Sequence, residues 1–226
     1  MEWLEIIQMQ KPIEDVGEYL NHVSRWPLFV NMASAAICMG ISAVYHLFFV
    51  YSTGAYSFLA KLDYTGIVIL CFGSAVSPTM YTYACSDVAH LRNFFMGCLI
   101  FTSVTVFLFT TLPYFARNDL KWLRGTMFVI FGISVSFPLL YSKFLFEESL
   151  ILDTDVFLFA LGGAFYIAGA VLYSTKVPER CKPGAYDICG HSHQIFHVCV
   201  FIGALIHYFE SLKCFYRRQT HFCPIK

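Results

Sequence analysis

The chain has 226 residues, of which 58% are hydrophobic, 18% aromatic and only 13% charged, and its formal net charge is zero. Soluble domains are about 25% charged, and one soluble core of this length cannot hide so much apolar surface. The composition therefore predicts an integral membrane protein, and the balanced charge gives no indication of a nucleic-acid partner.

Six apolar runs have the length of about 20 residues that a helix needs to cross a hydrocarbon core of about 30 Å. They lie at about 27–50, 63–83, 94–115, 125–142, 156–174 and 192–212. Barrel strands alternate every second residue, whereas residues 67–72 are apolar on both parities. We therefore expect an all-α fold, a polytopic bundle of six transmembrane helices.

The chain divides into a membrane domain and two short flanks. Residues 1–26 are too polar to span and are expected to form an interfacial N-terminal segment. Residues 27–212 form the bundle, and 213–226 a C-terminal tail. In the fifth span, four small residues would let neighbouring helices approach closely: Gly162, Gly163, Ala164 and Gly169.

Basic residues near the helix ends predict the orientation. Six crossings put both termini on one side, where the loops hold only Arg92 and Lys143. The other loops hold seven basic residues: Lys61, Arg117, Lys121, Arg124, Lys176, Arg180 and Lys182. We expect these basic loops to face the cytosol, or its equivalent in an organelle, and the termini to face the opposite side. The sequence does not indicate which membrane.

The nine cysteines do not predict a disulfide framework. Their number is odd, and four of them lie within apolar spans, where cysteine packs as a small hydrophobic residue: Cys38, Cys71, Cys98 and Cys199.

Four ionisable residues within the spans are candidate functional groups, because such residues are costly in a bilayer. His46 lies near the end of the first span, Asp63 opens the second, and His193 and His197 begin the sixth. The predicted topology brings all four to one face. Residues four apart share a helix face, so His193 and His197 together with His46 predict a three-histidine zinc (Zn2+) site.

Such a site leaves the fourth coordination position of the zinc open for water. Zinc would lower the pKa of that water to near neutral pH. Asp63 would orient that water or take its proton. Ser42, four residues before His46, is expected on the same helix face, where it would support the site or contact the substrate.

Plainer interpretations stay open for each of these residues. The two histidines of the sixth span are alternatively a hydrogen-bonded structural pair, and Asp63 a helix N-cap at the membrane surface. Ser42 is alternatively bonded to its own helix. His207 lies ten residues beyond His197, about 15 Å along the helix, so we expect it outside the cluster.

Five motifs in order resemble the progestin and adipoQ receptor family, specifically its adiponectin-receptor-like branch. They are SAVYH (42–46), LDYTGI (62–67), YIAGA (166–170), VPER followed by PG (177–184), and SHQIFH (192–197). The resemblance covers about residues 26–208. It implies zinc held by His46, His193 and His197 near the cytosolic face, with Asp63 hydrogen-bonded to the zinc-bound water.

The resemblance also implies a zinc-dependent membrane receptor or hydrolase with ceramidase-like action on a lipid amide, and membrane lipids or a fatty acid as ligands. The family has seven helices, so the predicted six indicate a chain that lacks the first. A partner membrane subunit would then fill the gap. The alternative function is a non-catalytic membrane subunit or scaffold that keeps the fold and the zinc site. A transporter is less favoured, because the charged residues form no path across the bilayer.

Overall fold

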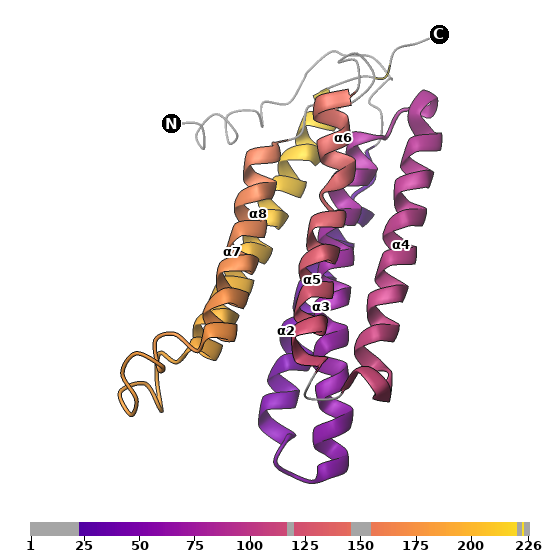
Figure 1. Cartoon of the computed structure of the whole chain (residues 1–226). Coiled ribbons are helices and arrows are strands. Elements are labelled where there is room, and N and C mark those ends of the chain that lie inside the picture. Colours follow the sequence, from indigo (N-terminus) through magenta and orange to yellow (C-terminus); the bar gives the residue numbers. More distant parts are fainter. Residues whose placement is uncertain (1–22, 117–119, 146–154, 221–222, 224–226) are drawn as a thin grey trace.

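The computed structural model describes residues 23–116, 120–145, 155–220 and 223, and within these ranges it contains helices and no strand (Figure 1). The predicted interfacial segment lies almost entirely outside the described residues. The helices are α2 (Trp26–Phe48), α3 (Thr53–Thr82), α4 (Ala89–Thr111), α5 (Lys121–Ser134), α6 (Phe137–Leu145), α7 (Val156–Thr175) and α8 (Ser192–Thr220), with 3-10 turns η1 (Ser86–Val88) and η2 (Pro113–Ala116).

Six stretches of the described chain are long and apolar enough to cross a membrane, which confirms the predicted multi-pass bundle. The fourth stretch, Leu123–Phe144, is made by α5 and α6 together. Two helices extend beyond the predicted apolar runs. Helix α3 begins ten residues earlier than expected, at Thr53 rather than 63, because Ser52 caps it by accepting a hydrogen bond from the Ala55 N–H. Helix α8 continues to Thr220, through most of the expected tail.

The helices form two pairs joined through the centre. Helix α2 packs along α3, α7 packs along α8, and contacts of α3 with α8 join the two pairs. Helices α4, α5 and α6 cover the remaining side of α3 (Figure 1). The α7–α8 pair leans away from the α2–α3 pair toward the end of the bundle where α8 begins (Figure 1).

Small residues set the spacing within the α7–α8 pair. A Cβ atom at Gly162 would lie 2.8 Å from Nε2 of His207, and one at Gly169 would lie 2.8 Å from Cβ of Cys199. Neither helix could approach so closely with larger side chains. Gly163 was also predicted to allow close packing, but it takes no part in this contact, because a Cβ there would meet no atom within 4 Å.

The two ends of the bundle are held differently. We call the end where α2 begins and α8 ends the terminal end, and the opposite end the histidine end (Figure 1). At the terminal end, Nδ2 of Asn31 donates to Oγ of Ser211 over 3.0 Å. There too Lys213 pairs with Asp155 over 2.6 Å. Polar and ionic contacts thus join α2, α7 and α8 at this end.

A disulfide between Cys85 and Cys223 also lies at the terminal end, with 5.5 Å between the two Cα atoms. This bond was not expected from the odd number of cysteines and the apolar setting of four of them. The disulfide ties the turn after α3 to the segment that follows α8. The guanidinium of Arg218 contacts both sulfur atoms, and its side chain is buried.

Candidate metal centre

Three histidines from two helices meet at the histidine end. His46 occupies the last turn of α2, and His193 and His197 occupy the first turns of α8. One ring nitrogen from each lies within 4.8 Å of the others, and no other group of this kind occurs in the described part of the chain. The predicted meeting of these side chains is what the structure shows; their role as metal ligands stays a prediction.

The imidazole rings surround a common point. The rings of His193 and His197 are stacked, with centroids 4.9 Å apart and planes at 28°. The His46 ring stands almost perpendicular to both, at centroid distances of 4.8 Å and 5.4 Å. Two rings from one helix and a third from the facing helix thus enclose the space between α2 and α8.

The donor set fits zinc. Neutral imidazole nitrogens are common zinc ligands, and three of them leave one coordination position open. Nε2 of His197 is buried and has no hydrogen-bond partner among the described residues. A buried polar nitrogen without a partner is unfavourable, and a metal ion would satisfy it. The alternative that the two α8 histidines are a hydrogen-bonded structural pair does not account for this nitrogen.

Asp63 approaches the cluster from α3. It lies ten residues after the helix begins and is half-buried, so the alternative that it caps α3 was wrong. Its carboxyl group is close enough to His197 to interact with it electrostatically. Helix α3 therefore carries an acidic group within electrostatic range of His197, and the role of Asp63 at the site stays a prediction.

Ser42 lies one turn before His46 on the buried face of α2. Its hydroxyl oxygen has no hydrogen-bond partner among the described residues. The alternative that Ser42 bonds its own helix was therefore wrong. The hydroxyl is buried and unpartnered, and its support of the site stays a prediction.

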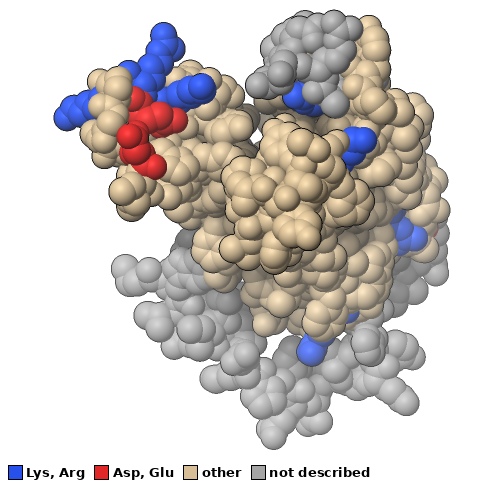
Figure 2. Space-filling view, turned by 90° about the horizontal axis from the view of Figure 1, so that it is seen from below, with Lys and Arg blue, Asp and Glu red and all other residues tan. Residues whose placement is uncertain are grey.

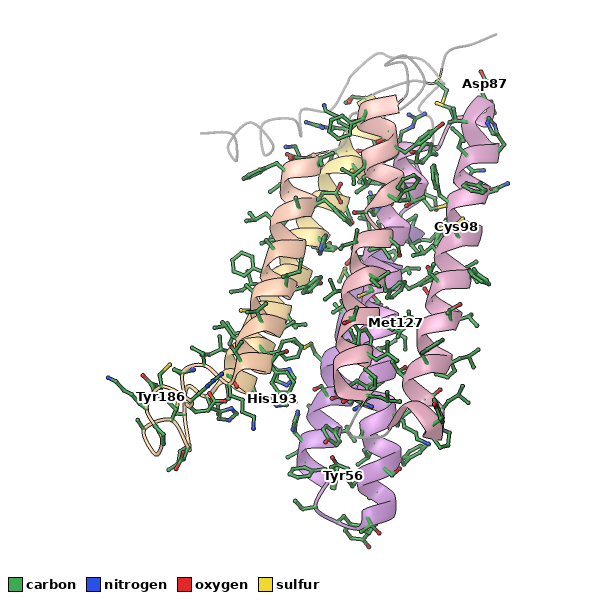
Figure 3. The ribbon with its side chains drawn as sticks, viewed as in Figure 1. Tyr56, Asp87, Cys98, Met127, Tyr186 and His193 are labelled. Atoms are coloured by element: carbon green, nitrogen blue, oxygen red, sulfur yellow. A yellow bond between two sulfur atoms is a disulfide. The ribbon has the colours of Figure 1, made fainter. Side chains whose placement is uncertain are left out.

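Aromatic rings hold the imidazoles in place. The Tyr173 ring meets His193 at a centroid distance of 4.9 Å and an angle of 78°. The Tyr45 ring lies 4.9 Å from His46. Figure 3 shows His193 at the start of α8, with Tyr56 of α3 lower in the view, nearer the end of the bundle. Tyrosine rings thus flank two of the three imidazoles.

Comparison with known proteins identifies the family. The family model described as "Haemolysin-III related" matches residues 6–208. The chain belongs to this family.

Curated relatives of this haemolysin-III-related protein are plant and animal membrane proteins. Heptahelical transmembrane protein ADIPOR3 of Oryza sativa subsp. japonica is 32% identical over 226 residues, covering 97% of this chain and 55% of the relative. ADIPOR2 of the same organism is 34% identical over 190 residues, covering 82% and 80%. Progestin and adipoQ receptor-like protein 1 of Caenorhabditis elegans is 29% identical over 197 residues, covering 86% and 44%.

The chain spans about half the length of several of these relatives. The printed names of the plant proteins call them heptahelical, whereas the described residues of this haemolysin-III-related chain contain six candidate spans.

The side chains of Glu179 and Ser192 position the histidines of α8 in this family member. Neither residue was assigned this role from the sequence. The backbone N–H of Ser192 and its hydroxyl both donate to the Glu179 carboxylate, which thereby caps α8. The hydrogen bond from the Ser192 hydroxyl is the main cause that holds the pKa of Glu179 below its usual value. Because Ser192 directly precedes His193, the capping bonds fix where α8 and its histidines begin.

Gln194 fastens the preceding loop. Its side-chain oxygen accepts from the Gly190 N–H over 2.6 Å, and its nitrogen donates to the Ile188 carbonyl over 3.1 Å. The signal for both roles was available in the SHQIFH motif, where Ser and Gln flank the first histidine. Serine directly before an apolar run commonly marks a helix N-terminus. Ser192 could therefore have been predicted to begin α8.

Proposed function

We propose that this chain is a zinc-containing membrane hydrolase or receptor of the adiponectin-receptor-like type, which acts on a lipid amide such as a ceramide. One observation carries the proposal: three imidazoles converge at one end of a membrane-spanning bundle, with the Asp63 carboxyl group in electrostatic reach of His197. The relatives named for progestin and adipoQ receptors support the family context.

His46, His193 and His197 would hold the ion. Bound zinc acts as a Lewis acid that makes a water acidic near neutral pH and polarises a carbonyl. Asp63 is placed to accept a proton beside the ion. The buried Ser42 hydroxyl, which has no hydrogen-bond partner among the described residues, would support the site from one turn before His46. Membrane lipids are the proposed source of the substrate, since the surrounding helices expose large apolar side chains.

The histidine end is proposed to face the cytosol or an equivalent compartment. Disulfides form in oxidising compartments, and the Cys85–Cys223 disulfide lies at the opposite, terminal end. Seen from the histidine end, the charges of the loop between α7 and α8 gather at one edge of the molecule (Figure 2). These include Lys176, Arg180 and Lys182, and basic loops favour the cytosolic side.

Metal analysis of the purified protein tests the site. We expect about one zinc per chain, lost in His193→Ala and kept in His207→Ala, a histidine of the same helix that lies outside the cluster. A wild-type protein without zinc, or equal zinc in both variants, would refute the assignment.

Ceramide hydrolysis in mixed micelles tests the chemistry separately. Asp63→Asn is expected to keep zinc and lose turnover by about 10²-fold or more, because a proton acceptor is removed. Unchanged turnover would reject the role of Asp63. Zinc without any turnover in the wild type would instead favour the non-catalytic membrane subunit.

A further inference from the structure

A second set of buried polar groups lies on α8 in the terminal half of the bundle. Glu210 has 0% of its surface exposed, and His207, one turn earlier, has 3%. Both belong to a helix that spans the membrane. Neither group takes part in the proposed zinc chemistry, since ten residues of helix, about 15 Å, separate His207 from His197.

Glu210 is incompletely bonded. Its Oε1 atom accepts from the Cys214 thiol over 3.0 Å, and its Oε2 atom is buried without a hydrogen-bond partner among the described residues. An ionised carboxylate in such a place is strongly unfavourable, and the usual response is to take up a proton and become neutral.

The cations near Glu210 are engaged elsewhere. On α8, Lys213 pairs with Asp155, which belongs to the start of α7, and Arg218 lies against the disulfide sulfurs. Asp155, Lys213 and Arg217 also act on Glu210 electrostatically.

The other neighbouring helices contribute neutral groups. From α7, the ring of Tyr166 stacks on His207. From α3, the Thr82 hydroxyl is buried without a partner among the described residues. From α2, Asn31 donates to Ser211. The Oε2 atom of Glu210 therefore has no cation in hydrogen-bond contact among the described residues.

His207 is a second buried titratable group on α8, one turn before Glu210. Its ring is held between Phe159 and Tyr166 of α7, at centroid distances of 4.5 Å and 5.4 Å. Its Nδ1 atom is buried and has no hydrogen-bond partner among the described residues. His207 and Glu210 are thus two buried titratable groups on one helix, and each has an unpartnered polar atom among the described residues.

The route for exchange points toward the terminal end. Toward the histidines, an apolar cluster of Cys38, Leu70, Val200 and Ala204 separates this region from the candidate metal centre. In the other direction lies the Lys213–Asp155 pair, whose side chains are 31% and 23% exposed. Lys213 is one helical turn beyond Glu210 and reaches the surface.

We propose that the carboxyl group of Glu210 is a proton-binding site inside the membrane that exchanges its proton with the terminal face. The site is independent of the zinc centre and of the proposed hydrolysis. Its ligand is a proton, held on the Glu210 carboxyl group when the protein is folded at neutral pH.

Infrared spectroscopy of the full purified chain, in a detergent without ester groups, tests the proposal. We expect the carbonyl stretch of a protonated carboxylic acid at neutral pH, and its conversion to carboxylate as the pH rises. Glu210→Gln, which is isosteric and cannot ionise, should lack the band. The control Asp187→Asn removes an exposed carboxylate at the opposite end of the bundle and should keep the band.

Absence of the band from the wild-type protein would overturn the proposal even if a variant failed to fold. Persistence of the band in folded Glu210→Gln would also overturn it.

Thermal stability supplies a second readout. The folded state holds one more proton than the unfolded state, so wild-type stability should fall as the pH rises through the titration, and that fall should be absent in Glu210→Gln. Stabilisation of the wild type alone by sodium or potassium ions would show that a cation occupies the site instead.

Discussion

The close contact between α7 and α8 at Gly162 can be tested by adding one methyl group. In Gly162→Ala the new Cβ would lie 2.8 Å, 2.9 Å and 3.0 Å from three ring atoms of His207. That ring cannot move aside freely, because Phe159 and Tyr166 pack against it. The helices must therefore separate locally or the ring must shift within its packing.

Overpacking of this kind costs about 1–3 kcal/mol. Alanine also favours the helix over glycine by about 1 kcal/mol, which offsets part of this cost. Gly163→Ala is the matched control, because its Cβ would meet no atom within 4 Å and it receives only the favourable contribution. We expect Gly162→Ala to be less stable than Gly163→Ala by about 1–3 kcal/mol.

Thermal unfolding of the two variants in the same detergent is the assay. A chain of this size changes its Tm by about 2–4 °C per kcal/mol, so the two midpoints should differ by about 2–12 °C. Equal midpoints would show that α7 and α8 are not packed at Gly162 as described, and the reasoning would fail.

Three further predictions concern contacts outside the spans. Glu179→Gln should weaken zinc affinity by about tenfold, measured by competition with a chelator, because Ser192 loses a charged acceptor. Burial alone would raise the pKa of Asp155, but hydrogen bonds from Lys213 and the Leu158 N–H lower it. Stability from this group is therefore present above the usual 3.8 and lost as the pH falls below it. Asp155→Asn, which keeps the helix cap, should remove this loss of stability when Tm is measured as a function of pH. If Tm falls equally at low pH in both proteins, the ion pair is contradicted. Cys85→Ser should lower stability by about 2–4 kcal/mol and abolish the reductant-dependent gel mobility of the wild type.

The membrane spans were largely predictable, because each is a long apolar run. The beginning of α3 was not, since Lys61 and Asp63 interrupt the apolar pattern while the helix passes through them uninterrupted. Its start depends on the Ser52 cap, a local signal that hydropathy does not detect.

The meeting of the three histidines was also predictable. An i, i+4 pair fixes two of them on one helix face, and the alternation of crossings brings His46 to the same end. The disulfide could not be predicted in this way, because Cys85 and Cys223 are 138 residues apart and both lie outside the apolar runs.

Glu210 is the clearest omission. It lies within the sixth predicted span, near its end, where a long acidic side chain can reach the aqueous boundary. Only its complete burial in the structure identifies it as an interior group. The sequence predicted the helix that carries Glu210. It did not show whether the side chain faces the interior of the bundle or the aqueous boundary.

The unequal fixing of the two bundle ends has a mechanical consequence. The α7–α8 pair is tied by Asn31–Ser211 and by the disulfide at one end, whereas His193 lies twenty residues from Lys213, a lever arm of about 30 Å. A tilt of one degree about the tied end would displace the histidines by about 0.5 Å, more than the tolerance of about 0.2 Å in metal–ligand distances. Metal affinity should therefore report small changes in helix tilt caused at the far side of the membrane.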